Sequence, residues 1–273
     1  MRNMASTERP NWAPESIDLE RPNAARIYDY LLGGAANFAT DREFAEQLLT
    51  MMPEARPAAR MNRAFLRRAV RFCVDAGIRQ FLDIGSGIPT AGNVHEIAQS
   101  MDPACRVVYV DSEAVAVTHS ELMLRGNENA ATLRADLTET DAILGSEQVR
   151  RLIDFDEPVA LLLVSMLHFV PDEVRPFEAV SRYVDRLAPG SYLVLSHGIE
   201  IEKERADQVD KLYEKSPTPG VRRRREDVAR FFAGLEMVEP GLVWTPLWRP
   251  ETPEDVGEEP ASAVIVAGVG RKP

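Results

Sequence analysis

Short apolar runs alternate with helical patterns between residues 81 and 196, and this alternation restricts the possible folds more than any other feature of the sequence. The apolar runs cover residues 81–84, 106–110, 131–135, 159–164 and 192–196. Between them, residues 91–101, 113–125 and 177–187 carry apolar side chains at the spacing of an amphipathic helix. Because parallel strands are joined by crossovers that are usually helices, the pattern predicts an α/β fold with a mostly parallel sheet between two layers of helices.

The segments on either side of this alternation complete the expected architecture. Helical patterns over residues 24–49, interrupted by Gly33-Gly34, and over residues 62–76 predict a helical cap at residues 21–77, ahead of a core domain at residues 78–273. Residues 1–20 are rich in Pro, Glu, Ser and Asn, and we expect them to be flexible. After a helix at residues 226–234, the runs 237–244 and 263–269 predict two closing strands. Their linker shows no helical pattern, which predicts an antiparallel hairpin at the end of a seven-stranded sheet.

Composition excludes several classes of function. A formal net charge of −11 is not the footprint of a general nucleic-acid binder, and no apolar run reaches the roughly 20 residues of a membrane helix. The two cysteines lack the spacing of a zinc site, and a chain of this length needs no disulfide scaffold, so we expect a cytoplasmic protein. The basic run at residues 222–225 is expected on a solvated loop, with contact to RNA or an acidic substrate as the alternative. The oligomeric state stays open.

A glycine turn directly follows the first predicted strand, in the order Asp83-Ile84-Gly85-Ser86-Gly87. In an open α/β sheet, ligands bind at the carboxyl ends of the strands. Gly85 and Gly87 allow a tight turn and a close approach to a ligand because they carry no Cβ. Asp83 places a carboxylate beside this turn, where it suits a cationic group. The turn therefore predicts a cofactor loop that includes Ser86, and a tight turn without a ligand is the alternative.

Two further acidic residues stand at the ends of the next two strands. Asp111, followed by Ser112, lies about where a ribose diol finds its acceptor in nucleotide-binding α/β folds. Asp136 is placed to accept a hydrogen bond from an adenine amine, and Leu137 offers an apolar face to the ring. Since the carboxyl ends of parallel strands meet at one sheet edge, the three carboxylates are predicted to lie in a line along an adenosyl ligand.

A nicotinamide dinucleotide is the rival ligand for this geometry. Its fingerprint G-x-G-x-x-G presents backbone N–H groups to a pyrophosphate. Here Thr90 occupies the third glycine position, and Pro89 removes one N–H donor. Asp83 is also a poor neighbour for a diphosphate and a good one for an ammonium group. The residues therefore favour S-adenosylmethionine as the cofactor, and no metal-ligand cluster is evident.

The segment after the fourth strand is expected beside the reacting methyl group. It contains Ser165, Met166 and His168. We interpret Ser165 and Met166 as cofactor contacts and His168 as a candidate catalytic base. The alternative for His168 is an imidazole that is hydrogen-bonded to the backbone near the pocket, because methyl transfer depends chiefly on alignment.

The sequence resembles the actinobacterial S-adenosylmethionine-dependent methyltransferases whose substrates are unassigned. The resemblance covers nearly the whole chain from about Arg21 and rests on ARIYDYLLGG at 25–34 with Asn37 and Phe38, and on residues 62–68, 81–96, 163–171, 187–192 and 239–243. One departure is Ser86-Gly87-Ile88, where the family more often has Thr-Gly-Leu.

This resemblance implies a Rossmann-like fold with bound S-adenosylmethionine. It places Gly85, Ser86 and Gly87 in the cofactor loop, Asp111 at the ribose, and Asp136 with Leu137 at the adenine. The family's amino-terminal helices would bring Tyr28, Gly33 and Asn37 near the pocket. The family supplies no substrate, so we expect an unidentified small-molecule methyl acceptor. Two alternatives remain: a cofactor-binding regulatory protein without turnover, and a nicotinamide-dependent oxidoreductase.

Overall fold

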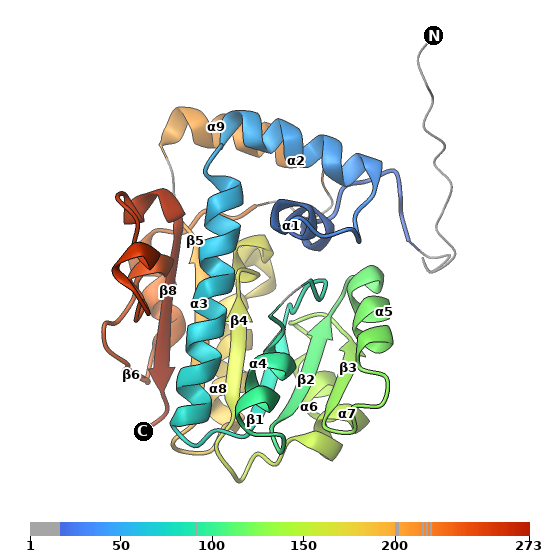
Figure 1. Ribbon diagram of the computed structural model, residues 1–273, viewed down its shortest axis with the longest axis vertical. Coiled ribbons are helices and arrows are strands. Elements are labelled where there is room, and N and C mark those ends of the chain that lie inside the picture. The colour runs from blue at the N-terminus through green and yellow to red at the C-terminus, as the bar shows by residue number, and fades with distance from the viewer. Residues whose placement is uncertain (1–16, 91, 200–201, 215, 217, 219) are drawn as a thin grey trace.

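The computed structural model of the chain describes residues 17–273 except 91, 200, 201, 215, 217 and 219 (Figure 1). Of the segment expected to be flexible, residues 1–16 lie outside this range. Among the helices of the described residues, none combines the length and the apolar character needed to cross a membrane.

One twisted sheet forms the centre of the molecule. Its strands within the described residues are β1 Gln80–Ile84, β2 Arg106–Asp111, β3 Ala130–Arg134, β4 Ala160–Val164, β5 Tyr192–Gly198, β6 Glu236–Met237, β7 Val243–Trp244 and β8 Ile265–Arg271. The strand order is β3-β2-β1-β4-β5-β8-β6, and β7 also pairs with β8. Strands β1 to β5 are parallel, whereas β8 runs antiparallel to β5. The predicted α/β class, with a mostly parallel sheet and antiparallel closing strands, is confirmed.

The expected strand at residues 237–244 is wrong in one respect, because it is two short strands that both pair with β8. The backbone N–H of Val238 still donates to Val269, after which Gly241 donates to the Val238 carbonyl and closes a turn. Pro240 inside this turn has no N–H to donate to a sheet, and Gly241 has a φ of +88°. The turn residues therefore interrupt an apolar pattern that reads as one strand.

Helices cover both faces of the sheet, and further helices lie over the carboxyl ends of its parallel strands (Figure 1). Within the described residues the α-helices are α1 Ala24–Leu32, α2 Ala39–Met51, α3 Ala55–Asp75, α4 Val94–Met101, α5 Ala114–Met123, α6 Thr140–Leu144, α7 Glu147–Leu152, α8 Pro176–Arg186, α9 Lys203–Tyr213 and α10 Arg225–Ala229. Short 3₁₀ turns are η1 Leu167–Phe169, η2 Asp172–Val174, η3 Arg230–Phe232, η4 Thr245–Leu247, η5 Pro253–Asp255 and η6 Pro260–Ala263.

The alternation of side chains along the strands divides the core into two layers. Leu82 and Ile84 of β1 pack into the cluster on one face of the sheet, together with Val180 of α8. Phe81 points to the other face, where it packs into the cluster that contains Phe65 of α3. Burial of both faces explains why β4 is apolar throughout, as central parallel strands usually are.

A helical cap lies over the carboxyl ends of the parallel strands. Helices α1 and α2 are separated where the sequence has Gly33, whose φ of +85° ends α1 in a left-handed conformation. Helix α9 packs beside α2 (Figure 1), and Val209 and Leu212 of α9 share a buried cluster with Ile27 and Leu48. The sequence analysis did not predict α9. The cap thus combines the amino-terminal helices with a helix from the second half of the chain.

A buried ion cluster joins this cap to the sheet. The Arg26 guanidinium lies 2.9 Å from Asp41 and 3.4 Å from Glu113, which is the N-cap residue of α5. Glu113 also accepts a hydrogen bond of 2.7 Å from the side chain of Asn23. Since Arg26 and Asp41 are almost completely buried, this network fixes α1 against the loop that follows β2.

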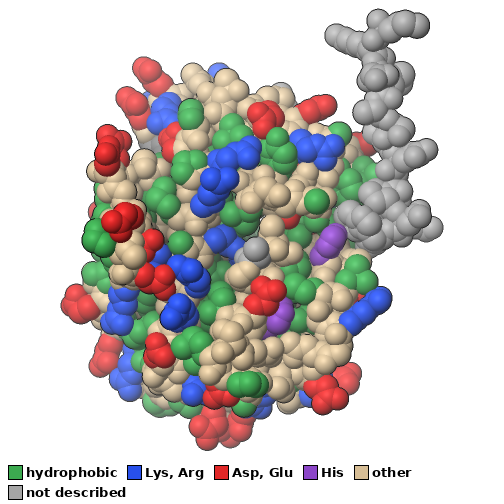
Figure 2. Space-filling view, viewed as in Figure 1, with side chains coloured by type: hydrophobic (Ala, Val, Ile, Leu, Met, Phe, Trp, Pro, Cys, Tyr) green, Lys and Arg blue, Asp and Glu red, His purple; other side chains and the backbone are tan. Residues whose placement is uncertain are grey.

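Acidic and basic side chains are interspersed over the face of the molecule shown in Figure 2. On the exposed side of α3, Arg67 and Arg71 both pair with Glu251. These two arginines therefore share one carboxylate of the same chain as their ion-pair partner.

Candidate functional site

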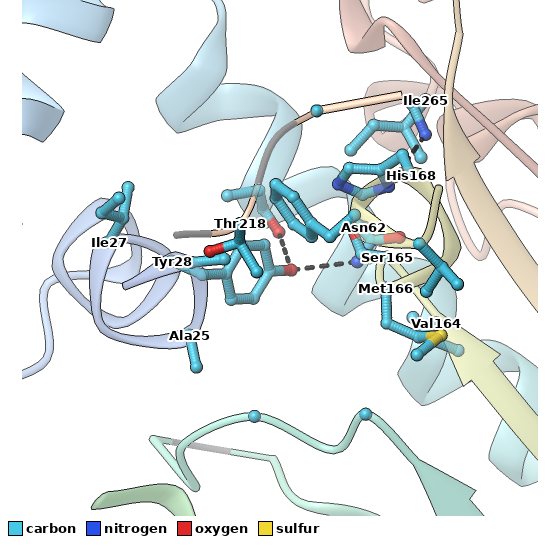
Figure 3. A pocket seen from close by; sticks show the side chains of 18 of the residues that line it. Ala25, Ile27, Tyr28, Asn62, Val164, Ser165, Met166, His168, Thr218 and Ile265 are labelled. Atoms are coloured by element: carbon cyan, nitrogen blue, oxygen red, sulfur yellow. Dashed lines mark hydrogen bonds between the residues drawn. The ribbon is translucent and has the colours of Figure 1, made fainter. Parts of the chain in front are cut away.

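A cavity of about 370 Å³ lies between the cap and the carboxyl ends of β1, β2, β3 and β4. Most of the residues that the sequence singles out line this cavity together, and Figure 3 shows four of them, Tyr28, Ser165, Met166 and His168. The singled-out residues that line the cavity are Tyr28, Asp83, Gly85, Ser86, Gly87, Asp111, Ser112, Asp136, Leu137, Ser165, Met166 and His168. The volume falls at the lower end of the range for small-molecule sites.

The glycine turn adopts a conformation that side chains resist. Gly85 has a φ of +70° and Gly87 a φ of +67°. A Cβ added to Gly85 would lie 2.7 Å from both Cβ and Cγ of Met166, closer than real Cβ atoms approach. At Gly87 the same Cβ would meet nothing within 4 Å, so the φ angle alone requires glycine there. The turn therefore presents bare backbone to the cavity.

Asp111 holds this turn against the next strand. Its Oδ2 accepts a hydrogen bond of 2.7 Å from the Gly87 N–H, and its Oδ1 accepts one of 2.8 Å from the Glu113 N–H. Burial raises the pKa of Asp111 to about 6, and the backbone N–H groups of Glu113, Gly87 and Ser112 oppose this rise. A carboxylate has about four acceptor sites, so the group keeps capacity to accept a hydrogen bond from a diol.

Asp83 is a largely buried residue whose carboxylate has no hydrogen-bond donor among the described residues. Only 5% of the residue is exposed. Burial raises the pKa of Asp83 to about 7, and the nearby Arg63 guanidinium lowers it. Because a buried polar group normally has a partner, this carboxylate fits a ligand that brings a cationic donor.

Asp136 and Leu137, which follow β3, line the cavity beside Asp83 and Asp111 at the carboxyl ends of the strands. The Asp136 carboxylate is exposed and accepts hydrogen bonds from the Thr138 N–H at 2.9 Å and from the Thr138 hydroxyl at 2.6 Å. Leu137 is buried, and its carbonyl accepts a hydrogen bond of 2.9 Å from Tyr183. This arrangement suits an adenine ring, because the carboxylate can accept a hydrogen bond from the exocyclic amine while the apolar side chain contacts the face of the ring.

The segment after β4 lies opposite the glycine turn. Ser165 has a φ of +59°, an uncommon conformation for a residue with a Cβ, and Met166 packs against Gly85. The His168 Nδ1 lies 3.4 Å from the backbone N of Gly198, which donates to it. Burial lowers the pKa of His168 to about 3, helped by His197 and Arg223. The imidazole is therefore uncharged at neutral pH and carries its proton on Nε2.

Tyr28 reaches the cavity from α1 and joins a chain of hydrogen bonds in its wall. The Tyr28 hydroxyl donates to the carbonyl of Ala59 and accepts from the side chain of Asn62 at 2.9 Å (Figure 3). The Oδ1 of Asn62 accepts a hydrogen bond of 2.6 Å from Ser196 in β5. This chain couples α1 and α3 of the cap to the sheet.

Gly33 and Asn37 are not among the described residues that line the cavity. Gly33 caps α1, and Asn37 donates to Asp29 at 2.8 Å and to the Gly34 carbonyl at 2.9 Å. Asp29 in turn accepts a hydrogen bond of 3.1 Å from Thr90 in the cofactor loop. The expected approach of these two residues to the pocket is thus indirect, because their polar contacts hold Asp29 against the loop.

Arg63 is a cavity residue that sequence reasoning missed. It lies on the same side of α3 as Ala59, Asn62 and Leu66, which also line the cavity, and it is close enough to Asp83 to lower the pKa of that carboxyl. The spacing of residues 59, 62, 63 and 66 is that of one helix face. That face carries an amide and a guanidinium among apolar residues. This polar pair on an otherwise apolar helix face is the sequence signal that could have identified Arg63.

The basic run at residues 222–225 is only partly solvated, because Arg224 is exposed whereas Arg223 is buried. Arg223 is only 3% exposed, and its guanidinium donates to the carbonyls of Leu167 and Val170 at 2.8 Å each. It also lies 2.5 Å from Asp172 and 3.0 Å from the Nε2 of His197. Arg223 therefore clamps the turn that carries His168, a role that depends on contacts distant in sequence.

No group of three or more His, Cys, Asp or Glu side chains that could hold a metal ion occurs within the residues that the structure describes. The cavity instead offers unpaired acceptors and bare backbone, which fits an organic cofactor with a cationic end.

Comparison with known proteins identifies the family. Residues 10–273 match the model of a family described as S-adenosyl methyltransferase. A putative methyltransferase from Thermobifida fusca YX is 41% identical, with a TM-score of 0.89 over 96% of this chain and 99% of the other. A DUF574 family protein from Streptomyces avermitilis MA-4680 is 37% identical, with a TM-score of 0.89 over 94% and 99%. None of the curated proteins matches. The chain therefore belongs to the S-adenosyl methyltransferase family, whose members use S-adenosylmethionine as the methyl donor.

Proposed function

We propose that the protein holds S-adenosylmethionine along the carboxyl edge of β1, β2 and β3 and transfers its methyl group to a small molecule bound under the cap. As a member of its family the protein is an S-adenosylmethionine-dependent methyltransferase; the positions and the acceptor class are the proposal. In this arrangement Asp83 receives the ammonium group, Asp111 the ribose hydroxyls, and Asp136 with Leu137 the adenine.

The carboxylate of Asp83, which has no hydrogen-bond donor among the described residues, carries this proposal. It stands beside the glycine turn, and the turn is braced by Asp111, the carboxylate with spare acceptor capacity. A cationic amino group supplies what Asp83 lacks, whereas the diphosphate of a nicotinamide dinucleotide would place negative charge beside it. Pro89 and the side-chain bond from Thr90 to Asp29 also fit a pyrophosphate loop poorly.

Arg63 completes the amino-acid end of the proposed cofactor site. It lines the cavity together with Asp83, and a guanidinium binds a carboxylate through parallel hydrogen bonds. We propose that Arg63 receives the carboxylate of the methionyl group while Asp83 receives the ammonium. The two ends of a zwitterion then meet opposite charges.

The bound cofactor supplies an activated methyl group, and the protein's own residues align the acceptor and exclude water. Met166 and Ser165 form the wall next to the glycine turn, and the hydrogen-bonded chain of Tyr28 and Asn62 fixes the cap above it. We propose that His168 orients the acceptor as an uncharged donor through Nε2–H, since a pKa of about 3 makes it a weak base.

Cytoplasmic localisation also stays a proposal. It is supported by Cys73 and Cys105, which are both buried free thiols, as is usual in a reducing compartment.

Calorimetry with the full chain tests the proposed cofactor. We expect S-adenosylhomocysteine to bind and reduced nicotinamide dinucleotide not to bind at micromolar concentrations. Transfer of labelled methyl groups to a low-molecular-weight fraction of a cell extract tests turnover and separates an enzyme from a regulatory binder. Binding of the nicotinamide in place of S-adenosylhomocysteine would contradict the proposal.

A further inference from the structure

The cap side of the cavity differs in chemistry from the sheet side. Apolar side chains from three helices line it: Ile27 and Leu31 of α1, Leu48 of α2, and Val209 of α9, with Met52 directly after α2. The aromatic rings of Tyr213 and Phe169 lie next to each other in this wall, with centroids 6.1 Å apart. Val209 and Tyr213 of this lining come from α9, so the complete wall could not be inferred from the amino-terminal segment alone.

The carboxylates of the cavity wall are engaged elsewhere. Asp83, Asp111 and Asp136 stand at the strand ends, where the proposed function assigns them to the cofactor. Glu113 also lines the cavity, and its carboxylate accepts hydrogen bonds from Arg26 and Asn23. An acceptor under the cap therefore meets no free carboxylate among these residues.

The one ion pair in the wall near α9 is self-contained. The Arg222 guanidinium lies 2.6 Å from Asp210 and also donates to the carbonyl of Ala206 at 2.6 Å. The Nη1 of Arg222 has no partner among the described residues, but that atom is buried and does not face the open space of the cavity. The charge of Arg222 is therefore balanced within the wall.

Two neutral polar side chains from the cap helices, Tyr28 and Asn62, already have hydrogen-bond partners. The Tyr28 hydroxyl and the Asn62 side chain bond to each other and to Ala59 and Ser196. His168 is uncharged and presents one donor. A charged group placed on the cap side of the cavity would lose its hydration without gaining an ion pair or a hydrogen bond that compensates for this loss.

We propose that the methyl acceptor is an uncharged, largely apolar molecule with an aromatic ring, bound between α1, α2 and α9. This inference rests on the proposed function, because it takes the sheet side of the cavity to be filled by the cofactor. Aromatic rings pack favourably against the edges and faces of Tyr213 and Phe169. The single donor of His168 orients a neutral oxygen or nitrogen of the acceptor.

Three naphthalene probes with the same ring system and substituents of different charge test this proposal. Naphthol is neutral at pH 7, naphthoate is an anion, and naphthylmethylammonium is a cation. The full chain is first saturated with S-adenosylhomocysteine, and the binding of each probe is measured by calorimetry. We expect naphthol to bind at least about tenfold more tightly than either charged probe.

A charge-inserting variant with a matched control sharpens the test. Met52→Lys places an ammonium group at the cavity wall and is expected to shift the preference at least about tenfold towards naphthoate. Met101→Lys makes the same change at an exposed position on α4 and should leave the preference unchanged. Thermal melting of both variants establishes that they are folded.

The outcomes separate the two proposals. Failure of S-adenosylhomocysteine to bind contradicts the proposed function. If it binds but a charged probe matches naphthol, or no probe binds at all, only the acceptor class is overturned.

Discussion

Replacement of Asp83 by asparagine changes one buried charge at the centre of the proposed site. The side chain keeps its size, but the carboxylate that would receive the cofactor's ammonium group is lost. A hydrogen bond to a charged group contributes about 1.5–3 kcal/mol. Because asparagine still offers a neutral acceptor, we expect a loss near the lower limit, which corresponds to about tenfold weaker binding of S-adenosylhomocysteine at pH 8.

The pH dependence gives a second measure of the same interaction. With a pKa of about 7, Asp83 is about one tenth ionised at pH 6 and about nine tenths ionised at pH 8. Because the neutral carboxyl, like asparagine, should bind the cofactor about tenfold more weakly than the carboxylate, cofactor affinity should rise about fivefold between these pH values. Asp111, with a pKa of about 6, adds a factor of about two over the same range. In Asp83→Asn only this smaller factor should remain.

The free energy of unfolding without cofactor should change with pH in the direction opposite to cofactor affinity. Burial raises the folded-state pKa of Asp83 above its ordinary value of 3.8, so the folded state binds more protons than the unfolded state between pH 4 and pH 7. Stability is therefore lost as pH rises through this range. Asp83→Asn removes that loss and should be more stable than the wild type at pH 8.

Calorimetry from pH 6 to pH 8 and urea unfolding at the same values provide the measurements. Asp156→Asn, at an exposed position after α7, is the matched control and should behave as the wild type. Equal affinity of Asp83→Asn and wild type at pH 8, or an unchanged pH dependence in the variant, would refute the reasoning.

Three further predictions follow from contacts around the cavity. Asp111→Ala removes the ribose acceptor and the brace of the glycine turn, and calorimetry should show affinity lower by about 1.5–3 kcal/mol per lost bond; unchanged affinity would mean that Asp111 is not the ribose ligand. Gly85→Ala sets a Cβ against Met166 and should abolish measurable cofactor binding, whereas normal binding would show that the loop is placed incorrectly. Arg26→Met leaves the buried Asp41 unpaired and should lower the free energy of unfolding by about 3–5 kcal/mol in urea titrations; a loss below about 1 kcal/mol would contradict a structural role for this pair.

The sheet and the glycine turn could be predicted because their signals are local. Strand β1, the turn at Gly85 and Gly87, and the acidic residues at the ends of β2 and β3 follow one another at regular spacing. A parallel sheet brings such strand ends to one edge. Residues separated widely in the sequence therefore line one cavity.

The missed features depend on contacts between distant segments. Helix α9 is mostly charged, and its few apolar residues are recognisable as a helix face only once α2 lies beside it. Arg223 sits in a basic run, and its burial depends on carbonyls more than fifty residues away. For α9 and Arg223 the deciding partner is absent from the local sequence. The run at residues 237–244 is different, because the turn that divides it is formed by Pro240 and Gly241 within the run itself.

A crystal structure of the full chain with S-adenosylhomocysteine tests the central claim most directly. We expect its amino group to lie within hydrogen-bond distance of Asp83, its ribose hydroxyls at Asp111, and its adenine beside Leu137. A nucleoside bound elsewhere, or these carboxylates facing solvent in the complex, would contradict the account.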